Sequence, residues 1–107
     1  MSKDFTFDRD DADWFEIWNT SSGVYSWVFE FISANVTDPA IVARIDEVVG
    51  KGYGAFGLTY FDTPEQAAEV VEVIRGPLLA AARHEHPHVL WQIEELAEMA
   101  TRWSESA

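Results

Sequence analysis

The three histidines are the residues of this chain whose spacing points most directly to chemistry. They occupy alternate positions in the segment His84-Glu-His-Pro-His88. In an extended segment such residues lie on one side, about 6.6 Å apart, and neutral imidazoles are good ligands for zinc, nickel or copper. Neighbours at this spacing converge on one ion only where the chain bends, and Pro87 is typical of the start of a helix. We therefore do not favour a metal site at His84, His86 and His88, and we expect a solvated corner between two helices.

Two other motifs match known sites by letters only. Gly52-Tyr-Gly-Ala-Phe-Gly57 reads G-x-G-x-x-G, but the dinucleotide motif follows a strand and precedes a helix, and here we expect the reverse order. The run Asp8-Arg-Asp-Asp-Ala-Asp13 is dense in oxygen ligands, yet it lacks the glycine and the bidentate glutamate of an EF-hand loop. We predict a turn at the first motif, a solvated acidic segment at the second, and no cofactor.

Acid–base chemistry has only weak support. Glu16 and Glu30 lie within apolar runs, where burial would raise the pKa of a carboxyl group and could create a general acid or base. Nothing in the sequence relates their positions to each other or to His86. Ser21 and Ser22 lack the flanking glycines of a nucleophile elbow. We predict that the protein is not an enzyme.

The aromatic residues of the N-terminal third carry more weight than these motifs. Exposed Trp and Tyr side chains surrounded by acids are typical of a hot spot for a basic protein. We predict that the contact residues are Trp14, Trp18, Tyr25 and Trp27, with Asp8, Asp10, Asp11, Asp13 and Glu16 as the acidic surround. The alternative is that helices or a second subunit cover both faces of the sheet, so a homodimer remains open.

The charge restricts the classes of partner. Seven basic and 19 acidic residues give a net charge of −12. Nucleic acid and anionic lipid both require clusters of Lys and Arg, so neither is expected as a partner. The absence of cysteine excludes a disulfide scaffold and a thiolate zinc site. If the charge is specific, it would steer a basic protein into contact; the alternative is an adaptation to high internal salt.

These features favour a binding module. A small, acidic and aromatic domain without chemistry of its own has the profile of immunity proteins, antitoxins and other inhibitors, which block a basic partner such as a nuclease or another toxin. The alternative is a small ligand- or metal-binding domain, monomeric or dimeric, that uses the aromatic sheet face and the histidine corner. We find no signal peptide and no apolar run of the ~18 residues that a membrane span needs, so we expect a cytoplasmic, bacterial protein.

Three strands are expected to position these residues. The segment 24–33 is rich in β-branched and aromatic residues and is predicted to be a strand. Its predicted hairpin partner is 14–18, joined through a loop at 19–23; the spacing of Trp14, Phe15 and Trp18 fits a helix as well. The third predicted strand is 55–61.

The predicted helices have clear boundaries. Asp38 and Pro39 begin one that Gly50 ends, and Thr63-Pro-Glu-Gln66 is a capping box that begins the next. Gly76-Pro77 is expected to break this second helix, and a last helix starts near Pro87. The prediction is one α+β domain over 1–107 with the order β-β-α-β-α-α. In it a small antiparallel or mixed sheet, a hairpin plus one strand, packs with two to four helices. Residues 1–12 are the part that we expect to be mobile.

Overall fold

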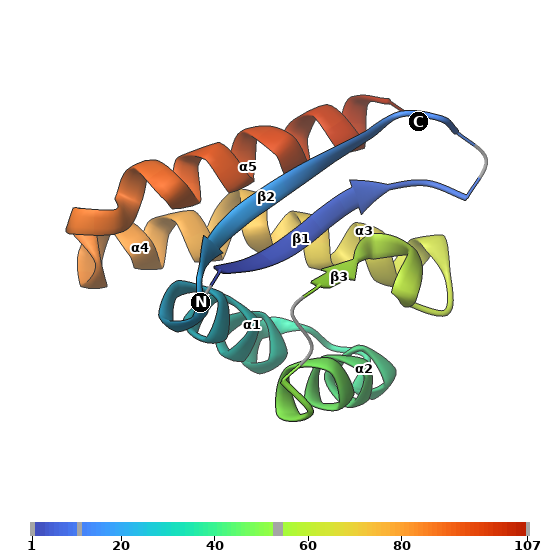
Figure 1. The fold of residues 1–107 in the computed structure, drawn as a ribbon, viewed down its shortest axis with the longest axis horizontal. Helices are drawn as coiled ribbons and strands as arrows, with labels where there is room; N and C mark the ends of the chain where they lie inside the picture. Colours follow the sequence, from blue (N-terminus) through green and yellow to red (C-terminus); the bar gives the residue numbers. More distant parts are fainter. Residues whose placement is uncertain (1, 11, 53–54, 107) are drawn as a thin grey trace.

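The protein folds as a small α+β structure, as predicted (Figure 1). The computed structural model describes residues 2–10, 12–52 and 55–106. The strands are β1 (Ser2–Asp8), β2 (Phe15–Ser21) and β3 (Ala55–Gly57). The α-helices are α1 (Ser22–Asn35), α2 (Pro39–Gly50), α3 (Pro64–Val73), α4 (Leu79–Glu85) and α5 (Leu90–Glu105). Three short helical segments join them, namely Leu58–Tyr60, Ile74–Leu78 and Pro87–Val89.

The sheet is mixed and has the strand order β2-β1-β3. The central strand β1 runs antiparallel to β2, with Phe5 opposite Trp18, and parallel to β3, with Phe5 opposite Phe56. These three side chains form one row across the inner face, and all are buried. At Gly57 a Cβ atom would lie only 3.3 Å from the carbonyl oxygen of Thr6. A glycine there lets β3 approach β1 closely.

The prediction of a strand at 24–33 is wrong, because this segment lies in α1. The buried residues of α1 are Tyr25, Val28, Phe29 and Ile32, which recur at the spacing of a helical face. Ser21 caps the helix by accepting a hydrogen bond from the amide of Val24. The predicted loop at 19–23 is wrong too, since these residues end β2 and begin α1. The apolar residues of this segment are so dense that they fit both the two-residue period of a strand and the 3.6-residue period of a helix. Packing against the rest of the protein decides in favour of the helix.

Residues 15–18 of the predicted strand 14–18 lie in β2, whereas Trp14 precedes it, and the partner of β2 is β1. We expected residues 1–12 to be mobile; instead, Ser2–Asp8 form the central strand, and Phe5 and Phe7 are fully buried. The alternation of polar and apolar residues in this segment was the available signal. The acids beside it obscured that signal.

The two capped helices are confirmed. Asp38 accepts from the amide of Ala40 at 2.9 Å at the start of α2, and Thr63 accepts from the amide of Gln66 at 3.2 Å at the start of α3. The predicted stop at Gly50 is displaced, because Gly50 is still helical and Gly52 has the positive φ of 72°. The predicted strand 55–61 ends at Gly57 and continues as a 3-10 turn.

The predicted break at Gly76-Pro77 does not occur. Ile74–Leu78 form a π-helical turn that connects α3 to α4. The wider turn accommodates Pro77, which has no N–H to donate. The last helix is confirmed as α5, with Ile93, Leu96, Ala100 and Trp103 among its buried residues.

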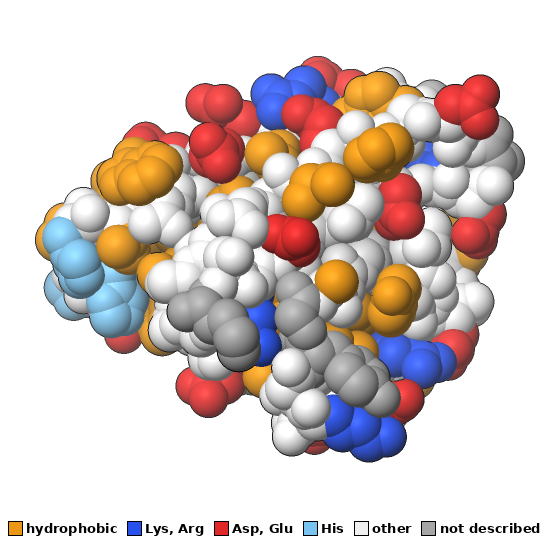
Figure 2. Space-filling view, in the orientation of Figure 1, with side chains coloured by type: hydrophobic (Ala, Val, Ile, Leu, Met, Phe, Trp, Pro, Cys, Tyr) orange, Lys and Arg blue, Asp and Glu red, His pale blue; other side chains and the backbone are white. Residues whose placement is uncertain are grey.

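The helices all lie on one side of the sheet (Figure 1). The other face of β1 and β2 is open to solvent, and acidic and hydrophobic side chains are interspersed on it (Figure 2). Among the residues that the structure describes, none of the helices combines the length and the apolar character needed to cross a bilayer.

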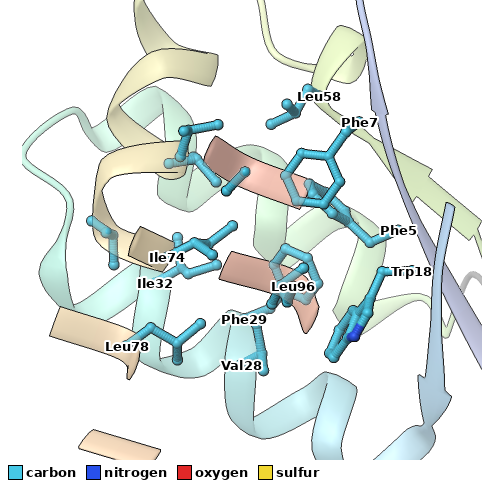
Figure 3. Close-up of a cluster of buried hydrophobic side chains, with 14 of the residues drawn as sticks. Phe5, Phe7, Trp18, Val28, Phe29, Ile32, Leu58, Ile74, Leu78 and Leu96 are labelled. Carbon is cyan, nitrogen blue, oxygen red and sulfur yellow. The ribbon is translucent and has the colours of Figure 1, made fainter. Parts of the chain in front are cut away.

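The core fills the space between the inner sheet face and the helices. Figure 3 shows Phe5, Phe7 and Trp18 pointing from the strands toward helical side chains such as Phe29. The ring centroids of Phe5 and Phe29 are 5.1 Å apart, and those of Phe5 and Phe7 are 5.2 Å apart. Because the aromatic residues on this side pack on one another, the inner face is unavailable to a partner.

Candidate functional site

On the exposed side of the sheet, apolar and acidic side chains meet on a surface that none of the described helices covers. We call it the outer sheet face, and its side chains come from alternate positions of the two long strands. They are Asp4, Thr6 and Asp8 of β1 and Phe15, Ile17 and Asn19 of β2. Phe15 is 59% and Ile17 49% exposed, which is unusual for residues of their size.

Contacts on the inner side determine which residues of β2 point outward. Trp18 donates from its indole nitrogen to the carbonyl oxygen of Gln92 at 3.0 Å, and the Thr20 hydroxyl donates to the Gln92 side chain. Both contacts join β2 to α5. Since successive side chains of a strand alternate between faces, Phe15 and Ile17 must project to the opposite side.

Hydrogen bonds hold the two carboxylates of the outer sheet face in place. Asp4 accepts from the Asn19 side chain on the neighbouring strand. Asp8 accepts from the amide of Thr59 at 3.2 Å and from its hydroxyl at 3.0 Å. Within the described residues neither carboxylate has an ion-pair partner, so no cationic side chain compensates either of them beside the apolar side chains.

The connection between β1 and β2 extends this acidic surface. Arg9 lies 3.8 Å above the ring of Trp103 and donates to the Trp103 carbonyl oxygen, which fastens the connection to α5. Asp10 and Asp13 beyond it are exposed, and Trp14 is 36% exposed. The predicted contact residue Asp11 lies outside the described residues.

Four of the predicted contact residues occupy places that change their role. Trp18 and Tyr25 are buried in the core, at 0% and 2% exposure, so neither can contact a partner from there. Burial, together with the charge of Asp4 and the nearby Tyr60, raises the pKa of Tyr25 to about 12. Glu16 is engaged in an ion pair with Arg102. Trp27 is half-buried and packs against Phe31 and His86.

The prediction missed the residues that are most exposed. Phe15 and Ile17 belong to the predicted strand but are not among the predicted contacts, although alternation with buried Trp18 places them on the outside. Trp91 is 64% exposed on α5. It falls outside the apolar stripe of that helix, and this position was the signal for exposure.

Helix α5 carries a second exposed acidic stretch next to Trp91, formed by Glu94, Glu95 and Glu98. Glu94 and Glu98 also line an open groove of about 650 Å³ between α5 and the π-helical turn. The arginines of this groove are already paired, Arg75 with Glu72 and Arg102 with Glu16. The groove therefore adds to the acidic surface.

Two of the three histidine rings of the corner lie close to each other. The rings of His86 and His88 are 5.9 Å apart between centroids, and the ring of His86 lies edge-on to Trp27 at 4.7 Å. Among the described residues, no three His, Cys, Asp or Glu side chains come together as a metal site, so the three predicted imidazoles do not converge. His86 and His88 line a hollow of about 370 Å³.

The residues weighed for acid–base chemistry lie in three different surroundings. Glu16 is held by Arg102, Glu30 lines a hollow beside Ile45 and Asp46, and His86 contacts Trp27. Among the described residues, these three side chains share no hydrogen-bond, ion-pair or ring partner.

Comparison of the chain with protein-family models, curated proteins and solved structures gives no match.

Proposed function

We propose that this protein is an acidic binding module that captures a basic protein on its outer sheet face. In this proposal it acts in the cytoplasm as an inhibitor, in the manner of an immunity protein or antitoxin, and blocks a nuclease or another toxin. The observation that carries the proposal is the exposure of Phe15 and Ile17 on the same sheet face as Asp4 and Asp8, whose carboxylates have no ion-pair partner among the described residues.

The two kinds of side chain would serve different steps of binding. Carboxylates attract a basic protein over a distance and accelerate its encounter, while the burial of apolar side chains holds it, at about 25 cal/mol for each Å² of apolar surface removed from water. Four carboxylates, those of Glu16, Glu47, Asp62 and Glu72, are engaged with arginine in ion pairs. The net charge of −12 remains uncompensated.

A short peptide of alternating lysine and leucine is a suitable probe, because it presents cationic and apolar side chains to the same face. We expect it to shift the NMR signals of β1 and β2 in a titration, and to bind more weakly as salt is added. Ile17→Lys places a cation at the centre of the outer sheet face. Ala43→Lys, on the exposed side of α2, is the matched control, because each variant changes the net charge from −12 to −11.

Comparison of the two variants shows whether binding depends on the outer sheet face or only on the net charge of the protein. If the outer sheet face is the contact, Ile17→Lys weakens binding by about tenfold or more, and Ala43→Lys by about twofold or less. Equal weakening by both variants would mean that only the net charge matters and would overturn the proposed site. Circular dichroism of both variants verifies that the fold is retained.

A further inference from the structure

We propose that the hollow between the start of α1 and the histidine corner is a second, independent site, which binds a small aromatic carboxylate. The hollow measures about 370 Å³. Its walls are Trp27, Val24 and Val89, and its polar side chains are those of His86, His88 and Ser21. A volume of this size falls in the range of small-molecule sites.

The absence of acids from its walls distinguishes this hollow in so acidic a protein. The other three hollows described here are all lined by carboxylates. These are Glu72, Glu94 and Glu98 in the first, Asp8, Asp10 and Asp62 in the second, and Glu30 and Asp46 in the third. The walls of the histidine hollow carry none. An anion can therefore enter it without meeting a like charge at contact distance.

The shape of the walls favours a ring. The indole of Trp27 is half-buried and is held by Phe31 at a centroid distance of 5.8 Å and by His86 at 4.7 Å. An aromatic ring that enters beside Val24 and Val89 would pack on this fixed indole and bury apolar surface on both sides. Contacts that hold a side chain in place before binding lower the entropy that binding must overcome.

The two imidazoles favour a carboxylate. His86 and His88 stand 5.9 Å apart between ring centroids, so a group with two oxygens can accept a hydrogen bond from each. A carboxylate accepts stronger hydrogen bonds than a neutral group does. The first turn of α1 also carries no acidic residue, so the positive end of its dipole adds to the field of the histidines.

Phenylacetate and its neutral isostere phenylacetamide test both parts of the proposal. In an NMR titration of the full chain at pH 6, we expect phenylacetate to shift the indole N–H signal of Trp27 and the methyl signals of Val24 and Val89. Phenylacetamide has the same ring without the charge. It is expected to bind at least about fivefold more weakly.

Two single variants test whether a histidine that lines the hollow recognises the carboxylate of the probe. His88 is exposed, so His88→Ala should not disturb the fold, and it should weaken phenylacetate binding by about fivefold. His84→Ala is the matched control, because His84 is also exposed and does not line the hollow. This control should bind like the unmodified protein.

Three results would overturn the proposal. The first is equal binding of phenylacetate and phenylacetamide, and the second is equal loss in His88→Ala and His84→Ala. The third is the lack of saturable shifts around Trp27 up to about 20 mM probe, a concentration far above that of a selective site. None of these results bears on the lysine–leucine peptide, because the residues named for the outer sheet face do not line this hollow.

Discussion

The Arg102 guanidinium donates to both carboxylate oxygens of Glu16, from Nε to Oε2 at 2.8 Å and from Nη2 to Oε1 at 2.7 Å. This bidentate pair joins the last helix to the edge strand β2. The hydrogen bond with Glu16 also raises the pKa of Arg102 above its usual range. Glu16 is thus a structural partner of α5, whereas Asp4 and Asp8 of the outer sheet face have no ion-pair partner among the described residues.

Loss of this pair should loosen the join between α5 and β2. We expect Glu16→Gln to lower the Tm by about 2–4 °C, and less in 1 M salt, because screening weakens exposed ion pairs. Glu72→Gln is the control: it removes the single-contact, i,i+3 pair with Arg75 inside one continuous helical stretch. Thermal unfolding of both variants should show a smaller change for Glu72→Gln. An equal change would mean that the bidentate geometry contributes nothing.

Tyr25→Phe should not destabilise the protein at neutral pH. The Tyr25 hydroxyl is buried and has no hydrogen-bond partner among the described residues. Removal of an unsatisfied buried polar group is neutral or stabilising, by up to about 1 kcal/mol in the free energy of unfolding. Urea denaturation at pH 7 measures this directly. A loss of more than about 1 kcal/mol would reveal a partner for the hydroxyl.

The same residue predicts how stability changes at high pH. The pKa of Tyr25 is about 12 in the folded protein, compared with 10.0 for an unperturbed tyrosine. The folded state therefore holds its proton where the unfolded chain has lost it, so stability is fully present below pH 10 and falls as the pH rises toward 12. This fall should amount to about 2 kcal/mol. Urea denaturation at several pH values should show that it is absent in Tyr25→Phe.

The two glycines that follow the apolar stripe of α2 should respond in opposite directions to alanine. Gly50 is helical and a Cβ there would meet open space, so Gly50→Ala should raise the free energy of unfolding by about 0.5–1 kcal/mol. Gly52 has a φ of 72°. Gly52→Ala should lower the free energy by about 1 kcal/mol, because L-residues are strained in this region. If Gly50→Ala instead lowers the free energy of unfolding, helix α2 ends before Gly50.

Two tryptophans that look alike in the sequence should differ in their contribution to stability. Trp18→Ala removes a fully buried ring and its hydrogen bond to Gln92, which should cost about 3–5 kcal/mol. Trp27 is only partly buried at the edge of the core, and Trp27→Ala should cost about 1–2 kcal/mol. Chemical denaturation compares the two. Equal losses would place Trp27 in the core.

The sequence by itself determined the elements whose ends carry their own chemistry. Asp38 with Pro39, and Thr63 with Pro64, satisfy the first free amides of a helix from within a few residues, so α2 and α3 could be located without knowledge of the rest of the chain. The single apolar stripe of α5 also depends only on the local spacing of residues, so the sequence predicted this helix too. The charge of −12 is also a property of the sequence alone.

Only the tertiary structure decided which aromatic residues face the solvent. The run that became α1 satisfies the strand period and the helix period together, and the choice depends on what packs against it, here Phe5 and the other inner side chains. Once β1 takes the central position, pairing sends Trp18 inward and leaves Phe15 and Ile17 outside. Burial is a relation between segments far apart in the chain. For this reason, a local pattern could predict an aromatic, acidic surface but not the residues that form it.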